Sequence, residues 1–157
     1  MSYNKIINKY FSDNFNEDVV CLFKQGYVTD TVDFSAKCIN MLSDEVVDQP
    51  SSEFFIRIGM FGGSVNNASI GTAANVRKRQ QVSLRFNLYT PAGESNGKEI
   101  DMEAKLDALF LPINIKSADS YIYADTATPK TVARVDSTGS AVWSDKAITY
   151  RLVYEYY

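Results

Sequence analysis

Residues 54–111 carry the pattern that most restricts the fold of this chain: an apolar strand, a small polar segment, an alternating strand and an amphipathic helix. The first strand, FFIRIGMF at residues 54–61, is apolar except for one arginine and its glycine. Every second residue from Val82 to Leu88 is then apolar, the period of a strand with one face on a core. We therefore expect a sheet in which the first strand is central.

A helix follows these strands. Pro91 and Gly93 force a turn, and Pro112 ends the segment. Between them, one helix face collects four apolar residues, namely Met102, Leu106, Leu109 and Phe110. The pattern predicts a helix over residues 100–110 that covers one face of the sheet, with Glu103 and Asp107 on its solvated side.

The N-terminal region begins with a second predicted helix, over about residues 3–15. Its apolar side holds Ile6, Ile7, Tyr10 and Phe11, and its polar side holds Asn4, Lys5, Asn8 and Lys9. Residues 19–23 either extend this helix or begin a strand, because so short an apolar run has no decisive period. Residues 36–42 are typical of a strand, and residues 16–35 include a candidate accessory hairpin arm at 27–34.

The final third consists of short strands, at residues 113–115, 121–123, 131–135, 141–143 and 147–157, with a turn at 136–139. In the last strand, Ile148, Tyr150, Leu152, Tyr154 and Tyr156 share one side. No linker or long repeat divides the chain. The prediction is one α+β domain over residues 1–157, with a mixed, mostly antiparallel sheet and two helices packed on it.

Composition excludes several classes of protein. At 157 residues, with 45% hydrophobic and 22% charged residues, the chain suits one globular domain. A net charge of -3 disfavours tight nucleic-acid binding by a monomer. We expect no signal peptide and no membrane span. Cys21 and Cys38 are expected to be reduced, buried thiols, because their spacing fits no zinc motif.

The chain contains no histidine, which removes Ser-His-Asp, Cys-His and His-metal mechanisms. Two acidic runs, at residues 44–53 and 101–107, are interpreted as solvated surface. The glycines at 59, 62 and 63 form neither a phosphate-binding loop nor a dinucleotide fingerprint. We therefore expect no enzymatic activity, no cofactor and no metal.

The order of elements over residues 36–157 resembles the tail terminator (tail completion) proteins of long-tailed bacteriophages. The shared features are the strand at 54–60, the strand that closes in YTPAG at 89–93, the helix at 100–110, Trp143 near the last turn and an apolar terminal strand. The resemblance implies a virion structural protein that caps the tail tube as a hexameric ring and ends tube polymerisation. It also implies assembly in the host cytoplasm and a final location at the neck of the tail.

The implied partners are other copies of the chain, the tail tube protein and a head-completion or neck protein, with DNA passing through the ring without sequence-specific binding. A ring requires heterologous interfaces, in which two different patches meet. One alternative is another neck or tail component, either a head-tail stopper or a tube subunit. A second alternative is a small-ligand binding module that uses the tyrosine-rich sheet face.

Nine residues are the candidates for an interface: Gly62, Gly63, Asn66, Asn67, Arg77, Lys78, Arg79, Tyr154 and Tyr156. The three basic residues either line a channel or a protein contact, or form the solvated start of a strand. The two tyrosines are either an interface or a strand end. Residues 62–75 are too small and polar to pack alone, so we expect them to be mobile in the free subunit and ordered in the assembly.

Overall fold

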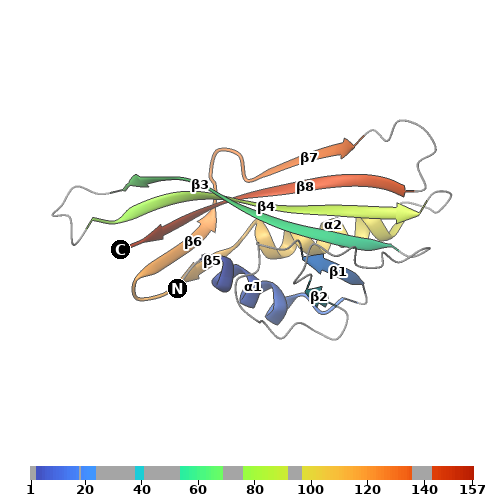
Figure 1. Cartoon of the computed structure of the whole chain (residues 1–157), viewed down its shortest axis with the longest axis horizontal. Helices are drawn as coiled ribbons and strands as arrows, with labels where there is room; N and C mark the ends of the chain where they lie inside the picture. The colour runs from blue at the N-terminus through green and yellow to red at the C-terminus, as the bar shows by residue number, and fades with distance from the viewer. Residues whose placement is uncertain are drawn as a thin grey trace.

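Figure 1 shows a computed structural model of the chain, which describes residues 3–17, 19–23, 38–40, 54–68, 76–91, 97–135 and 143–157. The elements in order are α1 (Tyr3–Asn14), β1 (Val20–Phe23), β2 (Cys38–Asn40), β3 (Phe55–Asn67), β4 (Lys78–Pro91), α2 (Gly97–Phe110), β5 (Asn114–Lys116), β6 (Ser120–Ala124), β7 (Lys130–Val135) and β8 (Trp143–Tyr156). No helix in the described ranges is long and apolar enough to cross a membrane.

The eight strands form one sheet in the order β2-β1-β3-β4-β8-β6-β5, and β7 also pairs with β8. Strand β1 runs parallel to β2 and β3, and the other pairs are antiparallel. This arrangement confirms the predicted fold class, a single α+β domain with a mixed, mostly antiparallel sheet and two helices.

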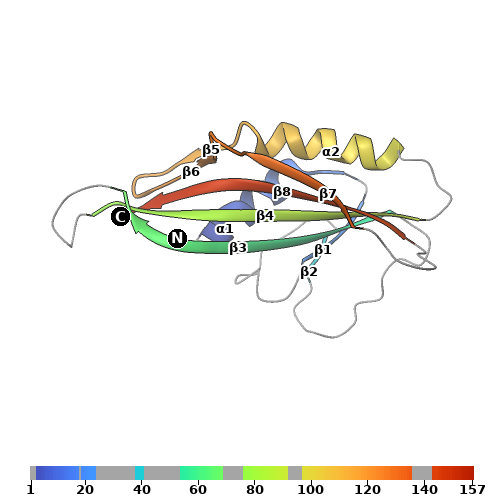
Figure 2. The ribbon, with the colours of Figure 1, turned by 90° about the horizontal axis from the view of Figure 1, so that it is seen from above.

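Three long strands, β3, β4 and β8, run the length of the sheet and give it two halves (Figure 2). In the half that we call the inner half, β1 pairs with β3 over Phe55–Ile58, and β7 pairs with β8 over residues 145–150. In the other half, the outer half, β6 pairs with β8 over residues 152–156, and β5 pairs with β6. The inner half has six strands and the outer half has five, with the three long strands shared.

Both helices pack on the same face of the sheet, which we call the helix face. Phe11 of α1 lies 5.8 Å from Phe86 of β4 and 6.3 Å from Phe110 of α2, measured between ring centroids. Phe110 also lies 5.4 Å from Tyr150 of β8. All four rings are buried, because the apolar side of each helix meets the apolar side of the alternating strands.

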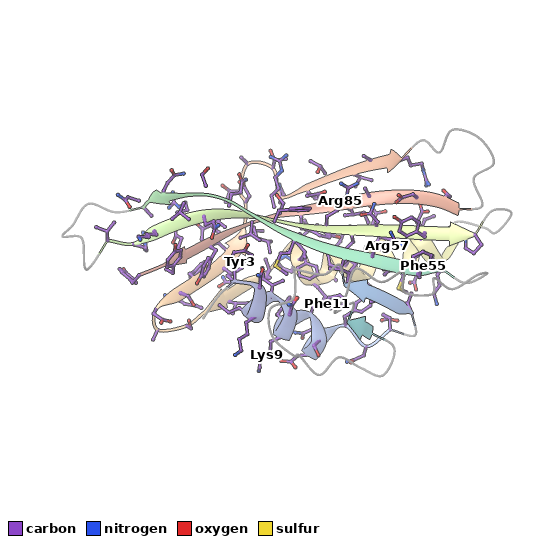
Figure 3. The ribbon with its side chains drawn as sticks, viewed as in Figure 1. Tyr3, Lys9, Phe11, Phe55, Arg57 and Arg85 are labelled. Carbon is purple, nitrogen blue, oxygen red and sulfur yellow. The ribbon has the colours of Figure 1, made fainter. Side chains whose placement is uncertain are left out.

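The opposite face carries the polar side of the same strands. Phe55 stacks on Tyr89 at 4.7 Å, and the guanidinium of Arg57 lies 5.6 Å from the Tyr89 ring centroid. Figure 3 shows Arg57 and Arg85 on the strands, away from Tyr3 and Phe11 of α1. The alternation read from residues 82–88 therefore places each side chain on the predicted face.

The segment at residues 62–75 differs from the prediction. Residues 62–67 continue β3 and pair with β4, with an irregularity between Gly62 and Val65, so they are not a loop. The sequence did not predict this part of the strand, because each of residues 61–67 is exposed. A segment without a buried face has no alternation of apolar and polar residues. Residues 69–75 lie outside the described ranges.

The acidic side of α2 also differs from the prediction, because it faces β7 and β8. Lys130 Nζ lies 2.9 Å from Glu103 Oε1 and 2.8 Å from Asp107 Oδ2. The Tyr150 hydroxyl donates to Asp107 Oδ1 at 2.6 Å. The Glu103 and Asp107 side chains are therefore only 18% and 28% exposed, and the interpretation of this run as solvated surface was wrong for these two residues.

Glu99 completes this row of acids one helical turn earlier. Its side chain is fully buried, Arg134 Nη2 lies 2.6 Å from Oε1, and Thr90 Oγ1 donates to Oε2 at 3.2 Å. Burial of a carboxylate is tolerated when it is paired and hydrogen-bonded. The row of ion pairs thus holds α2 against the inner half of the sheet.

Smaller differences concern the N-terminal region and the last strands. Asn8 is buried, although the helical pattern placed it on the polar side. Residues 20–23 form strand β1, which settles that alternative, and the predicted strand at 36–42 is described as β2 over Cys38–Asn40. Residues 143 and 147–156 belong to one strand, β8. Residues 27–34 and 136–139 lie outside the described ranges.

Candidate interface in the outer half of the sheet

The basic cluster at residues 77–79 is tied to an acidic residue of β8. Arg79 donates from Nε and Nη2 to Glu155 Oε1 at 2.8 and 2.6 Å. Arg77 Nε lies 3.8 Å from Glu155 Oε2, and the Tyr123 hydroxyl donates to Oε1 at 3.0 Å. Glu155 thus offsets part of the positive charge, and the cluster is not a free cationic patch.

These contacts change the protonation of the carboxylate. Burial alone would raise the pKa of Glu155, but hydrogen bonds from Arg79 and Tyr123 and the charge of Arg77 outweigh it and lower that pKa. Burial and the same carboxylate raise the pKa of Tyr123. Glu155 therefore stays ionised, and Tyr123 stays protonated, at neutral pH.

Two clefts include Tyr123 in their lining, beside the Arg79–Glu155 pair. One, of about 550 Å³, is lined by Arg77, Lys116, residues 117–121, Tyr157 and the Glu155 carboxylate. The other, of about 740 Å³, lies beside Arg79, Asn66, Gly63 and Asp125. Among the described residues, no group of three or more acidic, cysteine or histidine side chains is arranged to hold a metal ion.

Lys78 and the two candidate tyrosines belong to the helix face. Tyr154 is 7% exposed, stacks on Tyr156 at 4.8 Å and meets Tyr3 of α1 edge-on at 5.9 Å. Lys78 is exposed and opposite Tyr156 in the register of β4 and β8. The two tyrosines therefore make contacts within the subunit, where Tyr154 packs against the N-terminal residue of α1, Tyr3.

The two candidate glycines lie at the irregularity of β3. A Cβ on Gly62 would come within 2.6 Å of both the Tyr3 hydroxyl and Gln80 Nε2, and one on Gly63 would lie 3.2 Å from the Gln81 carbonyl oxygen. Gln80 Nε2 donates to the Gly63 carbonyl oxygen at 2.9 Å. Gly62 therefore allows close packing between α1 and the hairpin of β3 and β4.

The end of β3, over residues 62–67, is an exposed and uncharged strand segment with one large apolar side chain, at Val65. Val65 is 47% exposed, and the neighbouring candidates Asn66 and Asn67 are exposed as well. No charged residue and no proline occurs between Arg57 and Arg77. Beyond Ile58, β3 pairs with β4 alone among the described strands.

A third cleft lies on the far side of the outer half, between α1 and β5. It holds about 510 Å³, its lining is mostly apolar, and the lining residues include Ile6, Tyr10 and Ile115 together with the charged residues Lys9, Asp13 and Asp119. The sequence patterns did not identify this cleft, or Val65, Tyr123 and Glu155, because all depend on pairing between distant strands. The alternation of β8 did place Glu155 opposite the core, which was the only available signal.

The sequence matches no protein-family model and no curated protein sequence. One solved structure, whose name describes no function, is similar over 100% of this chain and 96% of that chain. The TM-score is 0.56 and the sequence identity is 15%, so the likeness concerns the fold alone. It supports the description of the whole chain as one α+β domain.

Proposed function

We propose that this chain is a virion structural protein, a tail terminator that caps the tail tube as an oligomeric ring. The observation that carries the proposal is the outer half of the sheet, where β3 ends in an exposed, uncharged segment with an apolar side chain at Val65. Natural proteins usually protect such strand edges with charge or proline. A segment without that protection is expected to be covered by a partner.

The proposal assigns the chain a hexameric ring, with the tail tube protein on one side and a head-completion or neck protein on the other. DNA would pass through the centre without sequence-specific contacts, in keeping with the net charge of -3 and the pairing of Arg77 and Arg79 with Glu155. The resemblance of residues 36–157 to tail terminators supplies the partners. The place of action would be the neck of the tail, after assembly in the host cytoplasm.

Size-exclusion chromatography with light scattering tests this proposal directly. The chain is measured over a range of concentrations, alone and with purified tail tube protein. We expect a ring-sized species, and bound protein at tube ends that stops further elongation. A strict monomer that never engages tube ends would contradict the proposal. Stacking of the chain into long tubes would instead identify a tube subunit, the first alternative.

A small-ligand binding module remains the second candidate, because the cleft of about 550 Å³ collects Tyr121, Tyr123 and Tyr157 beside two basic residues. This function requires a monomer that binds a ligand at that cleft. Native mass spectrometry of the purified chain distinguishes it from the ring: a co-purifying small molecule on a monomer favours the ligand-binding module.

A further inference from the structure

Among the described strands, the outer half of the sheet has two open edges, which lie on opposite sides. One is the end of β3, over residues 62–67, and the other is β5. Within the described part of the chain, β5 pairs only with β6, and this end of β3 pairs only with β4. Figure 1 shows the two edges separated by β4, β8 and β6. An open edge can accept another strand through main-chain hydrogen bonds.

Strand direction determines how copies of the chain can join at these edges. Each step from β3 through β4, β8 and β6 to β5 is antiparallel. Four reversals leave β3 and β5 pointing the same way. If copies follow one another around a ring, the end of β3 in one copy therefore meets β5 of the next in parallel, with the same sheet face turned inward in every copy.

One transverse row of residues connects the two edges. Val65 is opposite Gln80, Gln80 is opposite Tyr154, Tyr154 is opposite Ile122, and Ile122 is opposite Ile115. All of them share the helix face, because directly opposite residues in a sheet lie on one side. Val65 and Ile115 are thus the two ends of the same row.

The backbone at each edge points the right way for this contact. Ala68 donates its N–H to the Arg77 carbonyl oxygen, so by alternation Val65 turns its N–H and C=O away from β4. Ser117 donates to the Ser120 carbonyl oxygen, so Asn114 and Lys116 turn theirs away from β6. In a parallel pair, a residue bonds to the two neighbours of the residue opposite it. Val65 opposite Ile115 would bond to Asn114 and Lys116.

We propose that neighbouring copies join by parallel addition of β3 to β5, with Val65 of one copy seated against Ile115, Ile6 and Tyr10 of the next. The Val65 N–H donates to the Asn114 carbonyl oxygen, and the Lys116 N–H donates to the Val65 carbonyl oxygen. The valine fills part of the apolar cleft of about 510 Å³ between α1 and β5. This inference rests on the proposed ring, and it names the surfaces that close it.

A photo-crosslinking amino acid at position 65 tests the contact. The variant is assembled from a mixture of isotopically labelled and unlabelled copies, irradiated, and digested for mass spectrometry. We expect crosslinks between copies, from position 65 to residues of α1 or β5. The control carries the probe at Val132 of β7, which is exposed to the same extent, 47%, and should give no such crosslink.

A charge substitution provides the second measurement. Val65→Glu should weaken association more than about tenfold, because the carboxylate would have to enter a mostly apolar cleft whose lining includes Asp13 and Asp119. Val65→Ile should leave association intact, and Val132→Glu should do so as well. Circular dichroism checks that each variant is folded.

The outcomes separate this inference from the proposed function. A ring of normal mass whose position-65 crosslinks map to β7, to α2 or to the tube protein would overturn the strand addition and leave the ring standing. A folded Val65→Glu variant that still assembles normally would also overturn it. A wild-type chain that stays monomeric even with tube ends would overturn both.

Discussion

The two halves of the sheet use the same three long strands but differ in how their edges are protected. In the inner half, β7 adds to β8, β1 adds to β3, and α2 is held by ion pairs from Lys130, Arg134 and Lys146. In the outer half, β3 extends into an exposed and uncharged segment that pairs with β4 alone among the described strands. The difference suggests that the inner half maintains the fold, whereas the outer half forms contacts with partners.

The largest expected effect is on the free energy of unfolding, when a buried side chain of the inner half and an exposed side chain of the outer half are each truncated to alanine. Phe86→Ala should lower the free energy of unfolding by about 3–5 kcal/mol, because the buried ring contacts Phe11, Phe110 and Tyr150. Val65→Ala, at the exposed end of β3, should change it by less than about 0.5 kcal/mol. Urea unfolding of the dilute monomer measures both. Equal costs would refute the division of roles.

The next effect compares two arginine–glutamate pairs. Arg134→Met removes the closest cation from the fully buried Glu99, and should cost about 2 kcal/mol of unfolding free energy. Arg79→Met should cost less than Arg134→Met, because the Arg79 side chain is 50% exposed and Glu155 keeps Tyr123 and Arg77. Thermal and urea unfolding provide the measurement. The reverse order would show that the outer pair is the structural one.

Acid should weaken both halves in a defined pH range. The pKa of Glu103 is lowered, because hydrogen bonds and charge from Lys146 and Lys130 outweigh the effect of burial, and the pKa of Glu155 is lowered as described above. A carboxyl with a lowered folded-state pKa contributes stability above its unfolded pKa, about 4.3, and loses it as the pH falls further. Unfolding measured from pH 6 to pH 2.5 should show this loss.

Two variants assign that acid dependence to its groups. Glu103→Gln and Glu155→Gln should each have a flatter stability profile below about pH 4.3 than the wild-type chain. Lys78→Gln is the control, since it leaves both carboxylates and their partners in place. An unchanged profile in both glutamine variants would assign the acid dependence to other carboxylates.

The smallest effect on the free energy of unfolding is expected where α1 packs against the outer half of the sheet, at Gly62. Gly62→Ala should cost about 1 kcal/mol, because the new methyl group meets the Tyr3 hydroxyl and the end of Gln80, and both must shift. The cost should be lower in a Tyr3→Phe background, which removes one of the two close atoms. A double-mutant cycle by urea unfolding measures the coupling. A coupling energy of zero would show that the cost of Gly62→Ala does not come from its contact with the Tyr3 hydroxyl.

Elements with a clear apolar period could be predicted from the sequence. Residues 82–88, the apolar side of α2 and the last strand were all placed on the correct face, because burial imposes a period of 2 or 3.6 residues. The end of β3 could not be predicted in the same way. A strand exposed on both sides needs no apolar face, so its sequence resembles a loop.

The contacts of the candidate site depended on long-range pairing that no local pattern contains. Arg79 and Glu155 are 76 positions apart and meet only because β4 pairs with β8 in one register. Glu103 and Asp107 lie on the polar side of the helical pattern, which predicts a solvated position. In the structure they form ion pairs with Lys130 of β7 and Lys146 of β8, which no local pattern indicates. The cleft between α1 and β5 likewise joins segments from opposite parts of the chain.

Hydrogen–deuterium exchange of the free and assembled chain tests the central claim most directly, that the outer half is the assembly surface. We predict that the backbone amides of Val65 and Lys116, which face away from β4 and β6, exchange rapidly in the monomer and become strongly protected in the assembly, while Lys130–Val135 of β7 changes little. Equal exchange at Val65 in both states, or new protection confined to β7, would contradict the account.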